Sequence, residues 1–268
     1  MRSQMVARRD SGWESERLIG GAVEAAPIAF TVLLESGQYV AANRAAARLT
    51  GYARSELLGR TTSDLSDDPE RTGRVVAEAF RTGSGSGIRR IRRKDGAVFT
   101  AEYRLAPASL GRDRLIVAAW WPEDPALEPI GDGAVDRSPA SLLRAQERVL
   151  GVAFQHAPIA VTVSDGDGNY LALNDRACEI AGYTRSELFE LGAFGIVLSP
   201  ARPEGRLVDL PGIRAGVAEI RTGDGSTKQV AFRAATTELG SQEVRIGVWW
   251  EVSEGEPGSP SDGPVSSR

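Results

Sequence analysis

The chain contains very little of the chemistry that most catalytic and metal sites need. Its 268 residues include one cysteine, Cys178, and one histidine, His156. One cysteine cannot form an internal disulfide and suits a reducing compartment, so we expect the cytoplasm. One histidine leaves zinc sites and histidine-assisted nucleophiles without the partners that they need. The sequence therefore predicts no metal site, and it favours a protein that acts by binding over an enzyme.

Long apolar runs and a strong net charge are also missing. No stretch approaches the ~20 apolar residues of a membrane span, and no apolar run follows the N-terminal arginines, so we expect neither membrane association nor a signal peptide. The net charge is −4, which does not favour nucleic acid or an anionic membrane. The basic run at 89–94 lacks interleaved aromatic residues and is typical of a solvated strand, so we expect no nucleic-acid contact there.

What the chain does contain is one segment that occurs twice. Residues 26–57 and 157–188 share 17 identities in 32 ungapped positions, among them Asn43 with Asn174 and Tyr52 with Tyr183. The spacing is too long for a solenoid repeat and matches one small domain. The sequence therefore predicts two copies of one domain, and few residues remain for anything else.

The expected boundaries follow from composition and from the order of predicted elements. They are a disordered N-terminus at 1–13, a first domain with its N-terminal flanking helix at 14–124, a linker at 125–140, a second domain with its flanking helix at 141–252, and a disordered tail at 253–268. Asn43 and Asn174 are predicted helix N-caps. The first copy has a long amphipathic helix at 69–82, whereas prolines between 200 and 211 leave room for only a short helix in the second copy.

These motifs, taken in order, resemble the PAS (Per-Arnt-Sim) sensory domain. The matching residues are Gly37-Gln38-Tyr39, Asn43-Arg44-Ala45, Gly51-Tyr52 and Asp95-Gly96 in the first copy, and Gly168-Asn169-Tyr170, Asn174, Gly182-Tyr183 and Asp224-Gly225 in the second. The resemblance implies an α+β fold in which each domain is a five-stranded antiparallel sheet with helices on one face, enclosing a pocket that often takes a small molecule. It also implies that the flanking helices and the outer sheet face serve dimerisation.

The resemblance also bears on cofactors, and we expect none. PAS domains that bind haem usually supply a histidine from the long helix, and neither 69–82 nor 201–210 contains one. The light-sensing branch forms a covalent flavin adduct with a cysteine in a segment that here lacks one, because Cys178 lies on the helix capped by Asn174. That adduct is therefore excluded. A non-covalent flavin is not expected either, since Trp120 and Trp249 stand where that branch has its flavin-facing glutamine.

Two matched tryptophan pairs are the most distinctive feature beyond the family pattern. Strand alternation turns one member of each pair inward and the other outward. The register that the resemblance implies makes Trp120 and Trp249 the inward members and Trp121 and Trp250 the outward ones. An inward indole either fills the core or stacks on a planar ligand, and an outward one suggests an interface. The expected pocket residues are Phe99, Tyr103 and Trp120 in the first copy and Phe232, Trp249 and Arg245 in the second. Arg245 could pair with an anionic ligand at the pocket mouth or could simply lie on the surface.

Three functions fit these observations. The preferred one is a stand-alone tandem PAS protein, without an effector domain, that binds a small molecule, a protein partner or a second copy of itself and signals through protein–protein interaction. A second is a small isomerase- or cyclase-like tailoring enzyme of a biosynthetic pathway, with Tyr52, Tyr103, Glu102 and Tyr183 as candidate catalytic residues. A third is a structural scaffold in which the two copies pack sheet to sheet as a pseudo-dimer.

Overall fold

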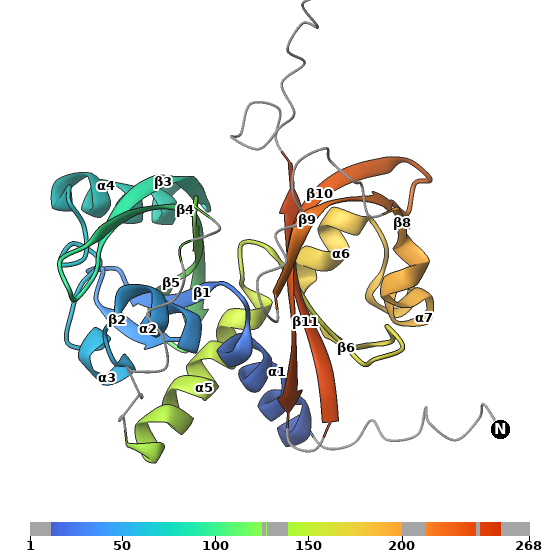
Figure 1. Cartoon of the computed structure of the whole chain (residues 1–268), viewed down its shortest axis with the longest axis horizontal. Helices are drawn as coiled ribbons and strands as arrows, with labels where there is room; N and C mark the ends of the chain where they lie inside the picture. Colours follow the sequence, from blue (N-terminus) through green and yellow to red (C-terminus); the bar gives the residue numbers. More distant parts are fainter. Residues whose placement is uncertain (1–11, 125–126, 128–138, 200–212, 240–241, 253–268) are drawn as a thin grey trace, which may run out of the picture.

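The computed structural model describes residues 12–124, 127, 139–199, 213–239 and 242–252. It confirms the α+β class: two antiparallel sheets, each with its own helices, lie on either side of a pair of flanking helices (Figure 1). The first sheet has the order β2-β1-β5-β4-β3. Its domain comprises β1 (Ala29–Leu34), β2 (Tyr39–Ala42), α2 (Arg44–Thr50), α3 (Arg54–Leu57), α4 (Pro69–Thr82), β3 (Gly85–Arg92), β4 (Val98–Leu110) and β5 (Asp113–Pro122).

The second domain repeats this order with one added strand. It comprises β6 (Ala160–Ser164), β7 (Tyr170–Leu173), α6 (Asp175–Ala181), α7 (Arg185–Ile196), β8 (Val197–Ser199), β9 (Ile213–Arg221), β10 (Thr227–Leu239) and β11 (Gln242–Glu251). Its sheet has six strands in the order β7-β6-β11-β10-β9-β8, so the expectation of five is wrong for this copy. The chain leaves α7 in an extended conformation at Val197, and Val197 pairs with Ile220 at the sheet edge.

Two predicted boundaries move slightly. The flanking helix of the first domain, α1 (Gly12–Ala25), begins two residues inside the segment expected to be disordered, 1–13. The flanking helix of the second domain, α5 (Ala140–Gln155), takes the last residue of the expected linker at 125–140. The expected tail and the short helix expected near 200–211 lie outside the described residues.

A buried asparagine ties each domain together at the same point. The side chains of Asn43 and Asn174 cap α2 and α6, as predicted, and each also bonds the first strand and the end of the flanking helix. Asn43 Oδ1 accepts from the amides of Phe30 and Ala46 at 3.0 Å, and Nδ2 donates to the carbonyls of Val23 and Ile28 at 2.9 Å. Asn174 makes the same set of bonds, with Val161, Ala177, Phe154 and Ile159. All the donors and acceptors of both amides are therefore used.

The flanking helices are exchanged between the two domains. Helix α5 lies over β1 and β2 of the first domain, whereas α1 contacts β7 and β10 of the second, and the two helices pack side by side (Figure 1). Gln146 of α5 accepts a hydrogen bond from the amide of Ala42 in β2 at 3.1 Å. Helices therefore cover the outer sheet face as well as the inner one, which corrects the expectation of helices on one face. The outer face is apolar in both copies and has to be buried.

The exchange produces one hydrophobic core that belongs to both domains. It lies between the two outer sheet faces and includes the buried side chains of Phe30, Val117 and Trp121 from the first copy and Phe154, Val248 and Trp250 from the second. Each domain also has its own inner core under the helices of its inner face. The described residues thus form three apolar clusters, and the shared one fixes the two domains to each other.

A buried acid lies at the edge of the shared core. Glu24 in the last turn of α1 is 6% exposed, and its Oε1 lies 2.5 Å from Arg54 Nη1. Burial raises the pKa of Glu24 to about 7, against the attraction of Arg54 and Arg44, and Glu147 of α5 raises it further. The second copy has Gln155 at the matching position. A neutral side chain is therefore compatible with this site.

Stability is expected to fall as the pH rises through this titration. The unfolded carboxyl has a pKa near 4.5, so between 4.5 and about 7 the folded chain holds a proton that the unfolded chain has lost. This group then contributes about 3 kcal/mol of stability at pH 4.5 that is gone above pH 7. Glu24→Gln should flatten this dependence in urea unfolding at pH 5 and pH 8. Glu70→Gln, on an exposed carboxylate, should leave it unchanged, and an equally steep dependence in Glu24→Gln would contradict the assignment.

Candidate functional site

A cavity of about 320 Å³ lies in the first domain, between the inner face of the sheet and α4. Its walls come from all five strands, from α4 and from the loop that precedes α4. The apolar part of the wall includes Leu33, Leu65, Val76, Leu105, Ala118 and Trp120. The polar part includes Tyr39, Thr62, Arg71, Thr72, Arg89 and Tyr103. A cavity of this size with a few converging polar groups is the usual form of a small-molecule site.

Two glycines of β3 leave room for the side chains of β4 that border the cavity. Gly87 pairs with Tyr103, which in turn pairs with Trp120, so the three form one row across the sheet. A Cβ at Gly87 would lie 2.9 Å from the Tyr103 hydroxyl, and the backbone there has φ 155°, a conformation that side chains disfavour. Gly85 lies beside Leu105 in the same way. Because β3 lacks side chains at these two positions, the Tyr103 ring can lie flat against the strand.

Arg89 follows these glycines on the same face of β3 and supplies the charge of the cavity. Its Nη2 donates to the carbonyl of Thr62 at 3.2 Å, and its positive charge lies close enough to Tyr39 to act on the pKa of that phenol. Its Nε is buried and has no hydrogen-bond partner in the structure as described. Burial raises the pKa of Tyr39, and Arg89 opposes that rise. Burial likewise raises the pKa of Tyr103, against Arg71 and Arg89. Both phenols are therefore neutral hydrogen-bonding groups.

Two of the three pocket residues predicted for the first copy, Trp120 and Tyr103, line this cavity. The third, Phe99, is not among the lining residues. It is buried in the inner core behind the wall, with its ring centroid 6.4 Å from that of Trp120 and a tilt of 34°. Arg89 was missed, because it sits inside a basic run that is typical of a solvated strand. The alternation Gly85, Gly87, Arg89, Ile91 is the signal that could have placed it on the inner face.

The second domain keeps the geometry of this row but not its polar groups. Gly216, Phe232 and Trp249 form the row that matches Gly87, Tyr103 and Trp120. Phe232 therefore stands in the place of Tyr103. Ala218 pairs with Val230 as Arg89 pairs with Ala101, so alanine stands in the place of Arg89. Trp249 is buried in the inner core and Phe232 packs against it. Arg245 lies further along β11, opposite Ser164 and Thr236, and is half-buried.

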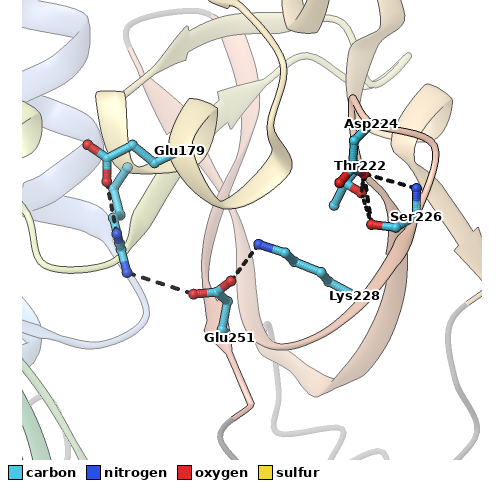
Figure 2. Close-up of polar contacts among 7 residues, drawn as sticks. Glu179, Thr222, Asp224, Ser226, Lys228 and Glu251 are labelled. Atoms are coloured by element: carbon cyan, nitrogen blue, oxygen red, sulfur yellow. Dashed lines mark hydrogen bonds and ion pairs between the residues drawn. The ribbon is translucent and has the colours of Figure 1, made fainter.

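Charged groups at the other end of this inner face are already paired with one another. Figure 2 shows Glu251 of β11 paired with Lys228 of β10. Glu251 also lies near Arg176 of α6, which in turn pairs with Glu179. The Lys228 Nζ lies 2.7 Å from Glu251, and Arg176 lies 3.9 Å from it. In the adjoining hairpin turn, hydrogen bonds from Thr222 and Ser226 lower the pKa of Asp224 to about 2 (Figure 2). These charged groups of the second copy are thus paired within their own domain.

The candidate catalytic residues are not brought together. Tyr103 lines the cavity, but Glu102, the next residue of β4, faces the other side of the sheet. There its negative charge opposes the effect of burial, which lowers the pKa of Arg233 in the second domain. Tyr52 lies beneath the guanidinium of Arg60, 4.5 Å from the ring centroid. Tyr183 belongs to the second domain, where it packs against the inner core. No acid–base pair of these four residues therefore shares one site.

The outward tryptophans meet each other across the shared core. The rings of Trp121 and Trp250 stack with centroids 4.2 Å apart and an angle of 28°. Both side chains are buried. This contact lies inside one chain, between its two domains.

Metal binding and membrane insertion are two further possibilities for a chain of this kind. Within the described ranges, no three histidine, cysteine, aspartate or glutamate side chains gather closely enough to hold a metal ion. None of the helices in the described part of the chain has the length and apolar character needed to cross a membrane.

Comparisons with known proteins bear on both halves of the chain. A family model described as PAS fold matches residues 19–120, and one described as PAS domain matches residues 147–211. No curated protein matches the chain. Among solved structures, a PAS domain from a two-component sensor histidine kinase is 19% identical, with 42% of this chain and 100% of that one covered and a TM-score of 0.39.

Two other solved structures are similar to one domain. The PAS domain of an HTR-like protein from Haloarcula marismortui is 23% identical, with 42% of this chain and 96% of that one covered and a TM-score of 0.34. A domain of a sensory box sensor histidine kinase/response regulator from Geobacter sulfurreducens is 18% identical, with 41% and 96% covered and a TM-score of 0.36.

Proposed function

We propose that this chain, which is a tandem protein of the PAS family, senses a small molecule in its first domain and signals its occupancy to a protein partner. PAS domains imply a sensory or regulatory role. The proposal adds which domain takes the ligand and how the second domain responds.

The observation that carries the proposal is the position of two neighbouring residues on β5. Trp120 lines the cavity, and Trp121, next in the chain, stacks on Trp250 of the second domain. A ligand that displaces the Trp120 indole also pushes on the β5 backbone that both residues share. Packed interiors transmit such displacements because they have few voids to absorb them. The stack is therefore the point at which occupancy of the cavity would alter the contact between the domains.

A scaffold function is the second candidate, and the shared core favours it. In that case the two domains form one rigid body, and the cavity has no ligand. Both candidates predict that Trp121 and Trp250 stabilise the protein. Only a sensor predicts that a bound compound changes the stack.

The sensor proposal is tested by filling the cavity. Ala118 lies in the wall, so Ala118→Leu places a larger side chain in the space and should weaken binding at least about tenfold, at a cost of roughly 1–3 kcal/mol in stability. Ala77→Leu makes the same change on the exposed face of α4 and serves as the control. Binding of a panel of neutral and charged one-ring compounds would be measured by calorimetry on the full chain.

If no compound of the panel binds, and native mass spectrometry of protein from its own cell reveals no bound molecule, the sensor proposal fails. Equal binding to Ala118→Leu and to the parent chain would place the ligand elsewhere.

A further inference from the structure

We infer that the cavity of the first domain takes a small aromatic monocarboxylate, with the carboxylate on Arg89 and the ring against Trp120. This inference rests on the proposed function, because it names the ligand class for the same cavity. It is carried by the charges of the wall, by the free donor of Arg89, by the shape of the space and by the comparison with the second domain.

The charges of the wall leave a positive excess at Arg89. Asp67 pairs with Arg92 at 2.8 Å and with Arg90 at 3.3 Å. The carboxylate of Asp68 caps α4 by accepting from the amide of Arg71 at 2.9 Å. Both acids of the wall are therefore engaged. Within the part of the chain that the structure describes, no carboxylate pairs with Arg89.

Arg89 is oriented by a neutral partner and has donor capacity left. The carbonyl of Thr62 accepts from Nη2, while the buried Nε has no partner among the residues that the structure describes. A buried donor without a partner is costly, and a guanidinium fork matches the two oxygens of a carboxylate. The Tyr103 hydroxyl, which borders the same space, can donate to that carboxylate as well. A single negative charge completes this arrangement.

The remaining space is small, apolar and bordered by rings. A volume of about 320 Å³ lies at the lower end of the range of small-molecule sites, which suits a compound of one ring. Trp120 presents its indole to this space, and Leu33, Leu65 and Val76 close the other sides. A flat ring stacks on an indole more favourably than a flexible chain of the same size does. The size fits one ring and one carboxylate.

The second domain provides an internal comparison. It has the same row of glycine, aromatic and tryptophan, yet it has Ala218 and Phe232 where the first domain has Arg89 and Tyr103. The fold therefore forms without these two polar groups. Their presence in the first copy alone indicates that they serve a ligand and not the sheet.

The experiment compares three probes by calorimetry on the full chain: phenylacetate, its neutral amide phenylacetamide, and hexanoate, an acid of similar size without a ring. Phenylacetate should bind at least about tenfold more tightly than either other probe. Arg89→Gln should weaken phenylacetate about 10- to 100-fold and change phenylacetamide less than about threefold, and Arg89→Lys should recover part of the loss. Arg112→Gln, the same change at the exposed turn between β4 and β5, should change nothing. Thermal unfolding of each variant shows whether it folds.

The outcomes separate the two proposals. If phenylacetamide binds as well as phenylacetate, or if Arg89→Gln weakens both equally, the carboxylate site is wrong while the sensor proposal stands. If hexanoate binds as tightly as phenylacetate, the ring is wrong. Should Arg89→Gln fail to fold, Tyr103→Phe, which copies the second domain, should still weaken phenylacetate more than phenylacetamide. No binding of any of the three probes overturns the carboxylate site, and the sensor proposal fails as well if the one-ring panel and native mass spectrometry also find no ligand.

Discussion

Replacing Trp250 by alanine is expected to destabilise both domains together, by about 3–5 kcal/mol. The indole is buried in the shared core and stacks on Trp121 with ring centroids 4.2 Å apart. Truncation removes this contact and leaves a cavity that the two sheets cannot close without moving. Trp121→Ala should have an effect of the same size. Urea unfolding followed by circular dichroism measures both.

The double variant tests whether the stack is one interaction. The stability lost by the double variant should be smaller than the sum of the losses of the two single variants, by about 0.5–3 kcal/mol. Each single variant already removes the same contact. Phe194→Ala, on an aromatic ring that is 66% exposed in the second domain, is the control and should cost little. The purified chain should remain monomeric in size-exclusion chromatography with light scattering. Unfolding of one domain with no change in the other would contradict a shared core.

Replacing Asn43 by alanine is expected to cost about 3–5 kcal/mol, as large a loss as a buried aromatic. The side chain makes four hydrogen bonds of 2.9–3.0 Å and is fully buried. Alanine would leave two backbone amides and two carbonyls with no partner and no access to water, and each such group costs about 1–3 kcal/mol. The surrounding backbone relaxes in the variant and some of the four groups find new partners, so we expect a total loss of about 3–5 kcal/mol and not the full sum.

The duplicated sequence supplies the matched test. Asn174→Ala removes the same four contacts in the second domain and should cost a similar amount. Asn43→Asp keeps the two accepted bonds but loses the two donated ones, so its loss should also be large. Asn169→Ala, at an exposed turn, should have little effect. A loss below about 1 kcal/mol for Asn43→Ala would show that the network is not what joins α1, β1 and α2.

These results depend on features that the sequence predicts unequally well. The caps at Asn43 and Asn174 follow from local rules, because capping acts over a few residues. The direction of each tryptophan follows from strand alternation together with the register that the family resemblance implies. The exchange of α1 and α5 does not follow. Each helix has an apolar face, but the face does not record which of two similar sheets it covers. The sixth strand, β8, was missed because three residues at a sheet edge carry no alternation signal.

The site residues were predicted only in part, again because a local pattern does not always show which face of a strand is buried. Trp120 and Tyr103 were found because the register implied by the family resemblance turns both of them inward. Arg89 was hidden, since a strand with charged residues on both faces looks the same whichever face is buried. Tyr103 and Glu102, two of the candidate catalytic residues, do not share a site, because neighbours in a strand point to opposite faces.

Signalling by this chain requires a link between the cavity and the contact of the two domains. The most direct measurement is ¹⁹F NMR of the full chain labelled with 5-fluorotryptophan, titrated with the compound of the one-ring panel that binds most tightly and assigned by single Trp→Phe variants. We predict that the signals of Trp120, Trp121 and Trp250 move together at one ligand per chain, while that of Trp249 stays in place. A shift confined to Trp120, or a shift of Trp249 without Trp120, would contradict the account.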